Sequence, residues 1–355
     1  MILVRWLIPL NTSPDPVLRP YMGVKPESQP LLAIWQRWDT LHYQAIAERG
    51  YSAFDTSLFT PPLYPFLMRV VSFLSGGNSL LAGMIISLAA CISAIIIFYR
   101  LAQFELKDEP RARWAVIYLA IFPTSFFLFA PYTEPLFLTG AVLCLLAMRK
   151  GDWLTAGFAG AFAASARLTG AILFLPVLWY AYKNWLEMRK PIVWLAPFLV
   201  AATSASFPLY TWLGLGYSIT APFEAQSQRF HGGITLPGIN IVKAFQEMFA
   251  GNFPATNFLD IFFTLIFLAA GVGVWKKLPR IYGVYYASFM AVYLIRIANV
   301  YPLLSMSRYV LSLFPAFLVM AQYDENPILK RILIYGSILG ALFLSAQFAM
   351  WGWVG

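Results

Sequence analysis

The stretch WQRWDTLHYQAIAERGYS, residues 35–52, gathers aromatic, acidic and basic side chains near the start of an otherwise apolar chain. If residues 33–48 are helical, the three-and-four spacing predicts a shared face made of Trp35, Asp39, His42, Tyr43 and Ile46. Aromatic rings stack on the apolar face of a pyranose, and a nearby carboxylate can take a hydroxyl proton. This face, flanked by Trp38, therefore fits a sugar site. An interfacial helix with an aromatic belt and a solvated Asp39 fits the same residues.

Three further stretches place polar chemistry beside apolar runs. FAPYTEPLF holds Tyr132 and Glu134, AASARLTGAILFLP holds Arg167, and LLSMSRYVLSLFP holds Arg308 followed by Tyr309. The stretches of Glu134 and Arg308 have a simpler interpretation as well. Glu134 could complement a helix dipole, and Arg308 could extend to the membrane interface.

An arginine at the bilayer centre costs about 2.5–3.5 kcal/mol on insertion scales, so it normally faces a cavity or a partner. Arg167 is such a residue, and Arg296, in YLIRIANVYP, is a less clearly placed one. Guanidinium groups bind phosphate through paired donors, and lipid phosphates lie at the membrane surface. The sequence contains no P-loop, no GxGxxG fingerprint after a strand and no zinc-ligand spacing. These features favour a lipid-phosphate sugar over a nucleotide sugar as the donor.

Composition indicates an all-α, polytopic membrane protein. Hydrophobic residues make up 60% of the 355 residues and charged residues 12%, against about a quarter charged in soluble domains. We expect one integral-membrane domain, 1–355, with an N-terminal segment and first outer loop (1–79) and a transmembrane bundle (80–350) that includes an outer stretch (214–257). Cys91 and Cys144 lie in apolar runs and are expected to be buried, which argues against a disulfide framework.

The apolar runs predict about ten spans. They are 80–104, 113–130, 133–148, 153–166, 168–182, 191–213, 258–275, 281–300, 308–323 and 331–350. Several are short for a bilayer and are expected to be broken or tilted. Residues 61–75 are expected to form an interfacial or re-entrant helix.

Basic residues predict the orientation of these spans. If the connections alternate between the two sides, one side receives 14 of the 25 lysines and arginines. They are Arg100, Lys107, Arg111, Arg113, Arg149, Lys150, Lys183, Arg189, Lys190, Lys276, Lys277, Arg280, Lys330 and Arg331. The positive-inside rule makes that side cytoplasmic, so the net charge of +9 indicates topology and no nucleic-acid partner.

The outer segments hold the mixed polar residues. They include both histidines, His42 and His231, and the stretch EAQSQRFHGG, whose Arg229 is a weak site candidate together with His231. The opening MILVRWLIPL is too short to span a bilayer and lacks a signal-peptidase site. It is expected to be either the end of a shortened first helix or a helix lying in the interface.

At four motifs the chain resembles the bacterial relatives of GPI mannosyltransferase II, the PIG-V-like proteins of the GT-C superfamily. The motifs occur in family order over residues 35 to 320. They are WQRWDTLHYQAIAERGY with the following TPPLYPFLMR, FPTSFFLFAPYTEPLFL, GFAGAFAASARLTGAILFLP and SMSRYVLSLFPAF. His42 and the missing or truncated first transmembrane helix depart from the family pattern.

The resemblance implies a glycosyltransferase with its site on the extracytoplasmic face of a bacterial plasma membrane. It implies a polyprenyl-phosphate donor, most often of mannose, a lipid or glycan acceptor, and inversion. Asp39 matches the base, Glu134 and Tyr132 match the second acidic motif, and Arg167 and Arg308 match donor-phosphate arginines. Trp35, Trp38, His42, Tyr43, Tyr132 and Tyr309 are the predicted substrate-binding residues.

Three alternatives stay open. In the first, Asp39 and Glu134 hold a divalent cation, Mg or Mn, as a cofactor. A lipid-linked sugar flippase or transporter would explain broken spans and an intramembrane arginine, although no repeated halves are visible. A non-catalytic membrane subunit would tolerate loss of Asp39 and Glu134.

Overall fold

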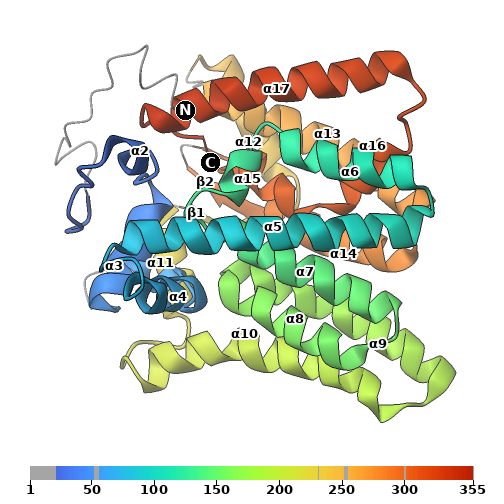
Figure 1. Ribbon diagram of the computed structural model, residues 1–355, viewed down its shortest axis with the longest axis horizontal. Helices are drawn as coiled ribbons and strands as arrows, with labels where there is room; N and C mark the ends of the chain where they lie inside the picture. Colours follow the sequence, from blue (N-terminus) through green and yellow to red (C-terminus); the bar gives the residue numbers. More distant parts are fainter. Residues whose placement is uncertain (1–20, 52–55, 231, 252–254, 300, 355) are drawn as a thin grey trace.

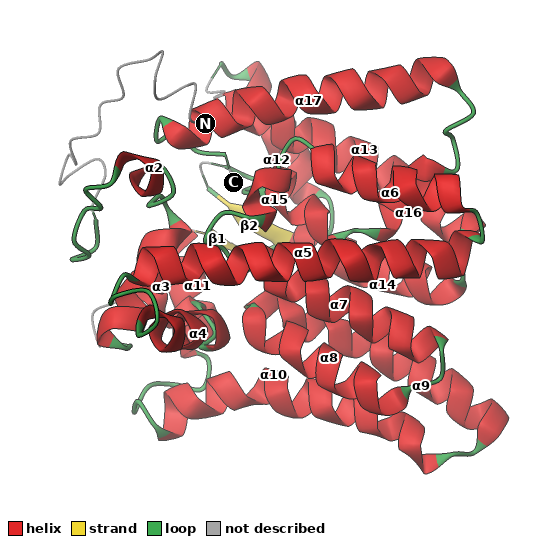
Figure 2. Cartoon of the chain, in the orientation of Figure 1, coloured by secondary structure: helices red, strands yellow, loops and turns green. Residues whose placement is uncertain are grey.

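A computed structural model describes residues 21–51, 56–230, 232–251, 255–299 and 301–354. The regular secondary structure of the described residues is helical apart from one short two-stranded ribbon, and loops connect the helices (Figure 2). The predicted all-α polytopic fold is therefore confirmed. The opening MILVRWLIPL lies outside the described residues.

Four helical segments are long and apolar enough to cross a membrane, by length and composition, among the residues described. They are α5 (Ser79–Leu106), η4 with α10 (Pro191–Leu213), α13 (Ala255–Lys277) and α17 (Pro327–Ala349). Their outward faces carry large apolar side chains; α17, for example, exposes Ile328, Ile332, Leu339 and Leu342. Such faces are ordinary against lipid and a liability in water, so the chain is an integral membrane protein.

The other predicted spans correspond to shorter or interrupted elements, as their length suggested. Non-helical backbone at membrane depth is tolerated where it is buried in protein or lines a cavity. The elements are α6 (Glu109–Ile121), η2 (Ser125–Leu128), α7 (Glu134–Arg149), α8 (Trp153–Ala166), η3 (Leu168–Leu173), α9 (Phe174–Met188), α14 (Arg280–Ile295), α15 (Met306–Tyr309), η5 (Val310–Ser312) and α16 (Pro315–Ala321).

Shorter elements gather at one end of the bundle (Figure 1). They are α2 (Pro30–Ala33), α3 (Asp39–Arg49), η1 (Thr56–Phe59), α4 (Leu63–Ser72), α11 (Ala221–Phe230) and α12 (Ile239–Phe249), with the ribbon of β1 (Gly232–Ile234) and β2 (Arg296–Ala298). The strands are antiparallel, and Ile234 lies opposite Arg296. Helix α4 exposes Phe66, and Phe73 and Leu74 directly after it are also exposed, as expected for an interfacial helix.

The expectation of one helix over residues 33–48 is wrong. Helix α2 ends at Ala33, α3 begins at Asp39, and Trp38 between them has φ 49°. The Arg37 guanidinium donates to the carbonyl oxygens of Ala33 (2.5 Å), Gln36 (3.0 Å) and Ala349 (3.3 Å). Two of these contacts are local, and the third joins this break to the last residue of α17.

Predicted basic loops meet at the opposite end of α5. Arg149 Nε lies 2.7 Å from Glu105 Oε1, near the end of α5, and Arg111, five residues after α5, lies 2.5 Å from Glu325, which precedes α17. The start of α5 instead touches α3, because Ser79 Oγ donates to Glu48 Oε1 at 2.6 Å. A 28-residue helix is about 42 Å long, so the basic loops and α3 lie on opposite sides of the bundle.

Small residues allow the central helices to approach closely. Helix α7 packs on α8, and α8 packs on α10. A Cβ atom added at Gly140 of α7 would lie 2.7 Å from the carbonyl oxygen of Ala159 and 2.9 Å from the Cβ of Ala163. Backbone atoms of α8 block this position, so only glycine fits without a shift.

Gly140→Ala should lower the thermal stability of the detergent-solubilised protein, by about 1–3 kcal/mol, because overpacking forces α7 and α8 apart. Gly336→Ala is the matched control, since Gly336 lies on α17 with open space around it. Alanine is the better helix former, so the control should be neutral or slightly stabilised. Equal thermal transitions for Gly140→Ala and wild type would contradict the packing described.

Candidate active site

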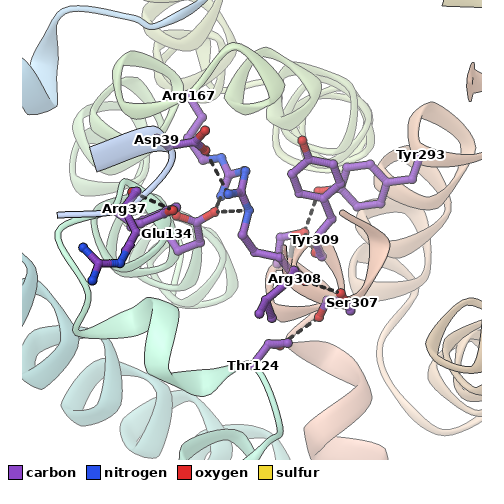
Figure 3. Close-up of polar contacts among 12 residues, drawn as sticks. Arg37, Asp39, Thr124, Glu134, Arg167, Tyr293, Ser307, Arg308 and Tyr309 are labelled. Atoms are coloured by element: carbon purple, nitrogen blue, oxygen red, sulfur yellow. Dashed lines mark hydrogen bonds and ion pairs between the residues drawn. The ribbon is translucent and has the colours of Figure 1, made fainter. Parts of the chain in front are cut away.

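Arg308 holds two carboxylates in one buried cluster (Figure 3). Its Nη1 lies 2.8 Å from Asp39 Oδ2, and its Nε lies 3.1 Å from Glu134 Oε1. Arg167 Nη1 reaches the same Glu134 oxygen at 2.5 Å. The Glu134 side chain is 4% exposed and that of Arg308 is 7% exposed. The four charged residues singled out in the sequence therefore meet at one place.

All four side chains project from points where a helix starts or stops. Asp39 opens α3 and Glu134 opens α7, so both carboxylates lie at helix N-termini, where the dipole stabilises negative charge. The expectation that Glu134 could complement a helix dipole therefore agrees with its place at the start of α7. Arg167 follows the last residue of α8 in an extended conformation, and Arg308 lies in the four-residue helix α15. These helix ends meet inside the bundle and bring the cluster together.

The short α15 helix is held by a polar network that fixes Arg308. Ser305, directly before it, has φ 65°. The Ser307 backbone N–H donates to Asp260 Oδ1 at 2.7 Å, and the Ser307 carbonyl accepts from Thr124 Oγ1 at 2.8 Å. Asp260 was missed in the sequence, although a lone acid in the apolar run NFLDIFFTLIFLAAG is a recognisable signal.

Aromatic rings enclose the charged cluster. The Arg308 guanidinium carbon lies 5.4 Å from the Tyr132 ring centre and 5.3 Å from that of Tyr309. Tyr43 meets Tyr132 edge to face with ring centres 6.0 Å apart. Burial, with added repulsion from Asp39 and Glu134, raises the pKa of Tyr43 well above its ordinary value. The Tyr43 phenol therefore stays protonated and can act as a hydrogen-bond donor.

Two adjoining cavities meet at this cluster. The smaller one, about 50 Å³, is lined by polar groups that include Asp39, Tyr43, Arg167 and Arg308. The larger one, about 620 Å³, is mainly apolar. Both are lined by Leu168, Thr169, Gln226 and Tyr309. A small polar cavity thus lies next to a space of the size that holds a ligand.

Other predicted substrate residues lie away from these cavities. Among the described residues, Trp35 and Trp38 are absent from the lining of both cavities. Trp35 packs against Phe129 and Phe348, with ring centres 5.6 and 6.3 Å away. Trp38 packs against Trp351 and Trp353, at 5.9 and 4.9 Å. The break before Asp39 turns both indoles toward the C-terminal segment, which differs from the expected shared face.

His42 and Tyr132 are buried behind the residues that line the small cavity. His42 is buried and meets Phe59, a residue of the small cavity's lining, with ring centres 5.2 Å apart. Tyr132 is fully buried, and its hydroxyl donates to the Arg37 carbonyl at 3.4 Å. His231 and the side chain of Arg229 lie outside the described part of the structure.

The residues present fit a divalent cation poorly. Asp39 and Glu134 each share a carboxylate oxygen with a guanidinium group, whose charge opposes a second cation nearby. In the described part of the chain, no three His, Cys, Asp or Glu side chains are grouped to hold a metal ion. We therefore derive no step through a metal, and the Mg or Mn cofactor stays a prediction.

Comparisons with known proteins agree with the motifs. A family model described as Mannosyltransferase (PIG-V) matches residues 15–188. GPI mannosyltransferase 2 from two strains of Cryptococcus neoformans var. neoformans serotype D is 25% identical over 198 residues, which cover 49% of this chain and 46% of the relative. The chain thus spans about half the length of the curated relatives it matches.

The fold agrees with a solved structure over a longer stretch. The crystal structure of ArnT from Cupriavidus metallidurans bound to undecaprenyl phosphate matches 97% of this chain and 63% of ArnT, with a TM-score of 0.55 and 14% identity. At this identity the likeness shows the fold alone. Residues 15–188 are therefore similar to the PIG-V mannosyltransferases, and the chain shares its helical fold with ArnT.

Proposed function

We propose that the chain is a membrane glycosyltransferase that moves a sugar, by family resemblance mannose, from a polyprenyl phosphate to a hydroxyl of a lipid or glycan acceptor. The observation that carries this proposal is the Arg308 guanidinium bound to both Asp39 and Glu134 at a polar cavity. That cavity adjoins an apolar cavity of about 620 Å³, a volume suited to part of a polyprenyl chain.

In the proposed reaction, Asp39 accepts the proton of the acceptor hydroxyl as its oxygen attacks the anomeric carbon. The new carbon–oxygen bond forms on the face opposite the phosphate, so the configuration inverts. The bond from the anomeric carbon to the phosphate oxygen breaks, and polyprenyl phosphate leaves with the electron pair. All atoms and charges are accounted for by donor, acceptor and the Asp39 carboxylate.

Arg308 and Arg167 are proposed to stabilise the phosphate as negative charge develops on it. Buried, preorganised cations act most strongly in such a water-poor site. Glu134 holds both guanidinium groups and leaves its Oε2 buried without a hydrogen-bond partner among the described residues. A sugar or acceptor hydroxyl would satisfy that oxygen. Tyr43 and Tyr309, which line the small cavity, are the aromatic groups placed to contact the sugar.

We propose the extracytoplasmic face of a bacterial plasma membrane as the site of the reaction. Support comes from the basic loops, which gather at the end of α5 away from α3 and Asp39. The positive-inside rule assigns that basic end to the cytoplasm. The reaction chamber then opens where nucleotide sugars are absent and a lipid-linked donor is required.

Purified protein in liposomes should transfer label from radiolabelled polyprenyl-phosphate mannose to a component of a membrane lipid extract. Asp39→Asn should lower the rate by about 100-fold or more, because loss of a general base typically costs 10²–10⁴-fold. Asp152→Asn is the matched control: Asp152 caps α8 in an exposed position, and asparagine caps as well.

The outcomes separate the parts of the proposal. Equal transfer by wild type and Asp39→Asn would keep the reaction and remove Asp39 as the base. Donor that crosses the bilayer without forming a product would identify a transporter. Wild-type protein that neither transfers nor moves this donor would overturn the polyprenyl-phosphate mannose assignment.

Glu134→Gln should reduce both transfer and thermal stability, because Arg167 and Arg308 would lose a buried counter-charge. Breaking a buried pair by removing one partner costs about 3–5 kcal/mol. Glu325→Gln is the control, because Glu325 pairs with Arg111 at 2.5 Å while its side chain is 80% exposed. Exposed pairs contribute about 0–1 kcal/mol, so Glu325→Gln should leave transfer and thermal stability nearly unchanged. Similar stability losses for both variants would contradict the buried cluster.

A further inference from the structure

Arg296 is a third arginine beside the site, and the surrounding backbone fixes its position. It opens β2, opposite Ile234 of β1, directly after α14 ends at Ile295. Its carbonyl accepts a hydrogen bond from Asn240 Nδ2 at 2.8 Å, and Asn240 is fully buried. The ribbon and α12 therefore hold Arg296 where the helix breaks off.

The Arg296 side chain lies between the charged cluster and the large cavity. Its guanidinium carbon is 5.1 Å from the centre of the Tyr309 ring, which stacks on Tyr293 with centres 5.2 Å apart. Arg308 and Arg167 approach the same Tyr309 ring at 5.3 and 5.5 Å. Arg296 lines the large apolar cavity, and Tyr309 lines both cavities. Three cations thus surround one tyrosine at the junction of the two spaces.

Arg296 differs from the other two arginines in lacking a counter-charge. Among the described residues it takes part in no ion pair within 4.0 Å, and its Nη1 is buried without a hydrogen-bond partner. The carboxylate in the described lining of the large cavity, Glu224, is exposed and accepts from Thr220 Oγ1 at 2.5 Å. A buried guanidinium nitrogen without a hydrogen-bond partner is costly, so the position of Arg296 Nη1 beside a cavity indicates an anionic ligand.

We infer that Arg296 binds the phosphate of a polyprenyl phosphate whose chain occupies the large cavity; this inference rests on the proposed function. The guanidinium fork offers paired N–H donors that match phosphate oxygens. The phosphate then lies between Arg296 and the cluster of Arg308 and Arg167. Those two arginines, already held by carboxylates, face the oxygen that joins the phosphate to the sugar. Arg296 thereby holds the lipid product as well as the donor.

Equilibrium binding of undecaprenyl phosphate to the full chain in detergent tests this assignment without any sugar transfer. Uncharged undecaprenol is the reference lipid, because it fills the apolar cavity but carries no phosphate. Arg296→Gln should weaken undecaprenyl phosphate binding about 10-fold or more and leave undecaprenol binding unchanged. Arg296→Lys keeps the positive charge but loses the paired N–H donors. Its affinity for undecaprenyl phosphate should therefore lie between those of Arg296→Gln and wild type. The matched control is Arg280→Gln, at the exposed opposite end of α14.

Each other outcome overturns the assignment in a distinguishable way. Undecaprenyl phosphate binding by Arg296→Gln at wild-type strength would place the phosphate elsewhere and leave the proposed transfer intact. Loss of binding of both lipids in Arg296→Gln would assign Arg296 a structural role in shaping the cavity. Wild-type protein that binds undecaprenyl phosphate no better than undecaprenol would overturn this inference together with the lipid-phosphate donor of the proposed function.

Discussion

A buried arginine that must be neutralised dominates the structure of the site. Arg308 is almost wholly enclosed, and it is stable there because Asp39 and Glu134 approach it from two other helices. Removing water from such a cluster strengthens every interaction within it. The same constraint links segments far apart in the chain, since the Arg308 and Asp39 bond joins residues separated by 269 positions. The bundle is thereby closed around the small polar cavity.

Breaks in the helices place Arg167 and Arg296 beside the two cavities. A continuous helix through residue 167 or 296 would keep its backbone groups bonded within the helix and its arginine against neighbouring helices. Instead α8 stops at Ala166 and α14 stops at Ile295, and extended backbone follows each. The freed segments line the two cavities, where irregular backbone is tolerated. The long helices α5, α10, α13 and α17 face lipid and supply the rigid frame.

Much of the cluster was predictable, because charged residues in apolar runs need partners and few partners exist. Glu134, Arg167 and Arg308 are such residues, and they meet each other and Asp39, which comes from the polar stretch near the start of the chain. The orientation of Trp35 and Trp38 was not predictable from local spacing. It depends on Arg37 reaching the carbonyl of Ala349, 312 positions away, and on rings near the C-terminus. The support of α15 by Asp260 also depends on a backbone contact that spacing does not reveal.

The most direct test of the account is a cryo-electron microscopy map of the protein with bound undecaprenyl phosphate. The account predicts phosphate density within hydrogen-bond reach of Arg296 and Arg308, beside Tyr309, with the polyprenyl chain in the apolar cavity of about 620 Å³. Lipid density confined to the outward faces of the long helices, with the apolar cavity lined by Arg296 and Tyr309 empty of lipid, would contradict it.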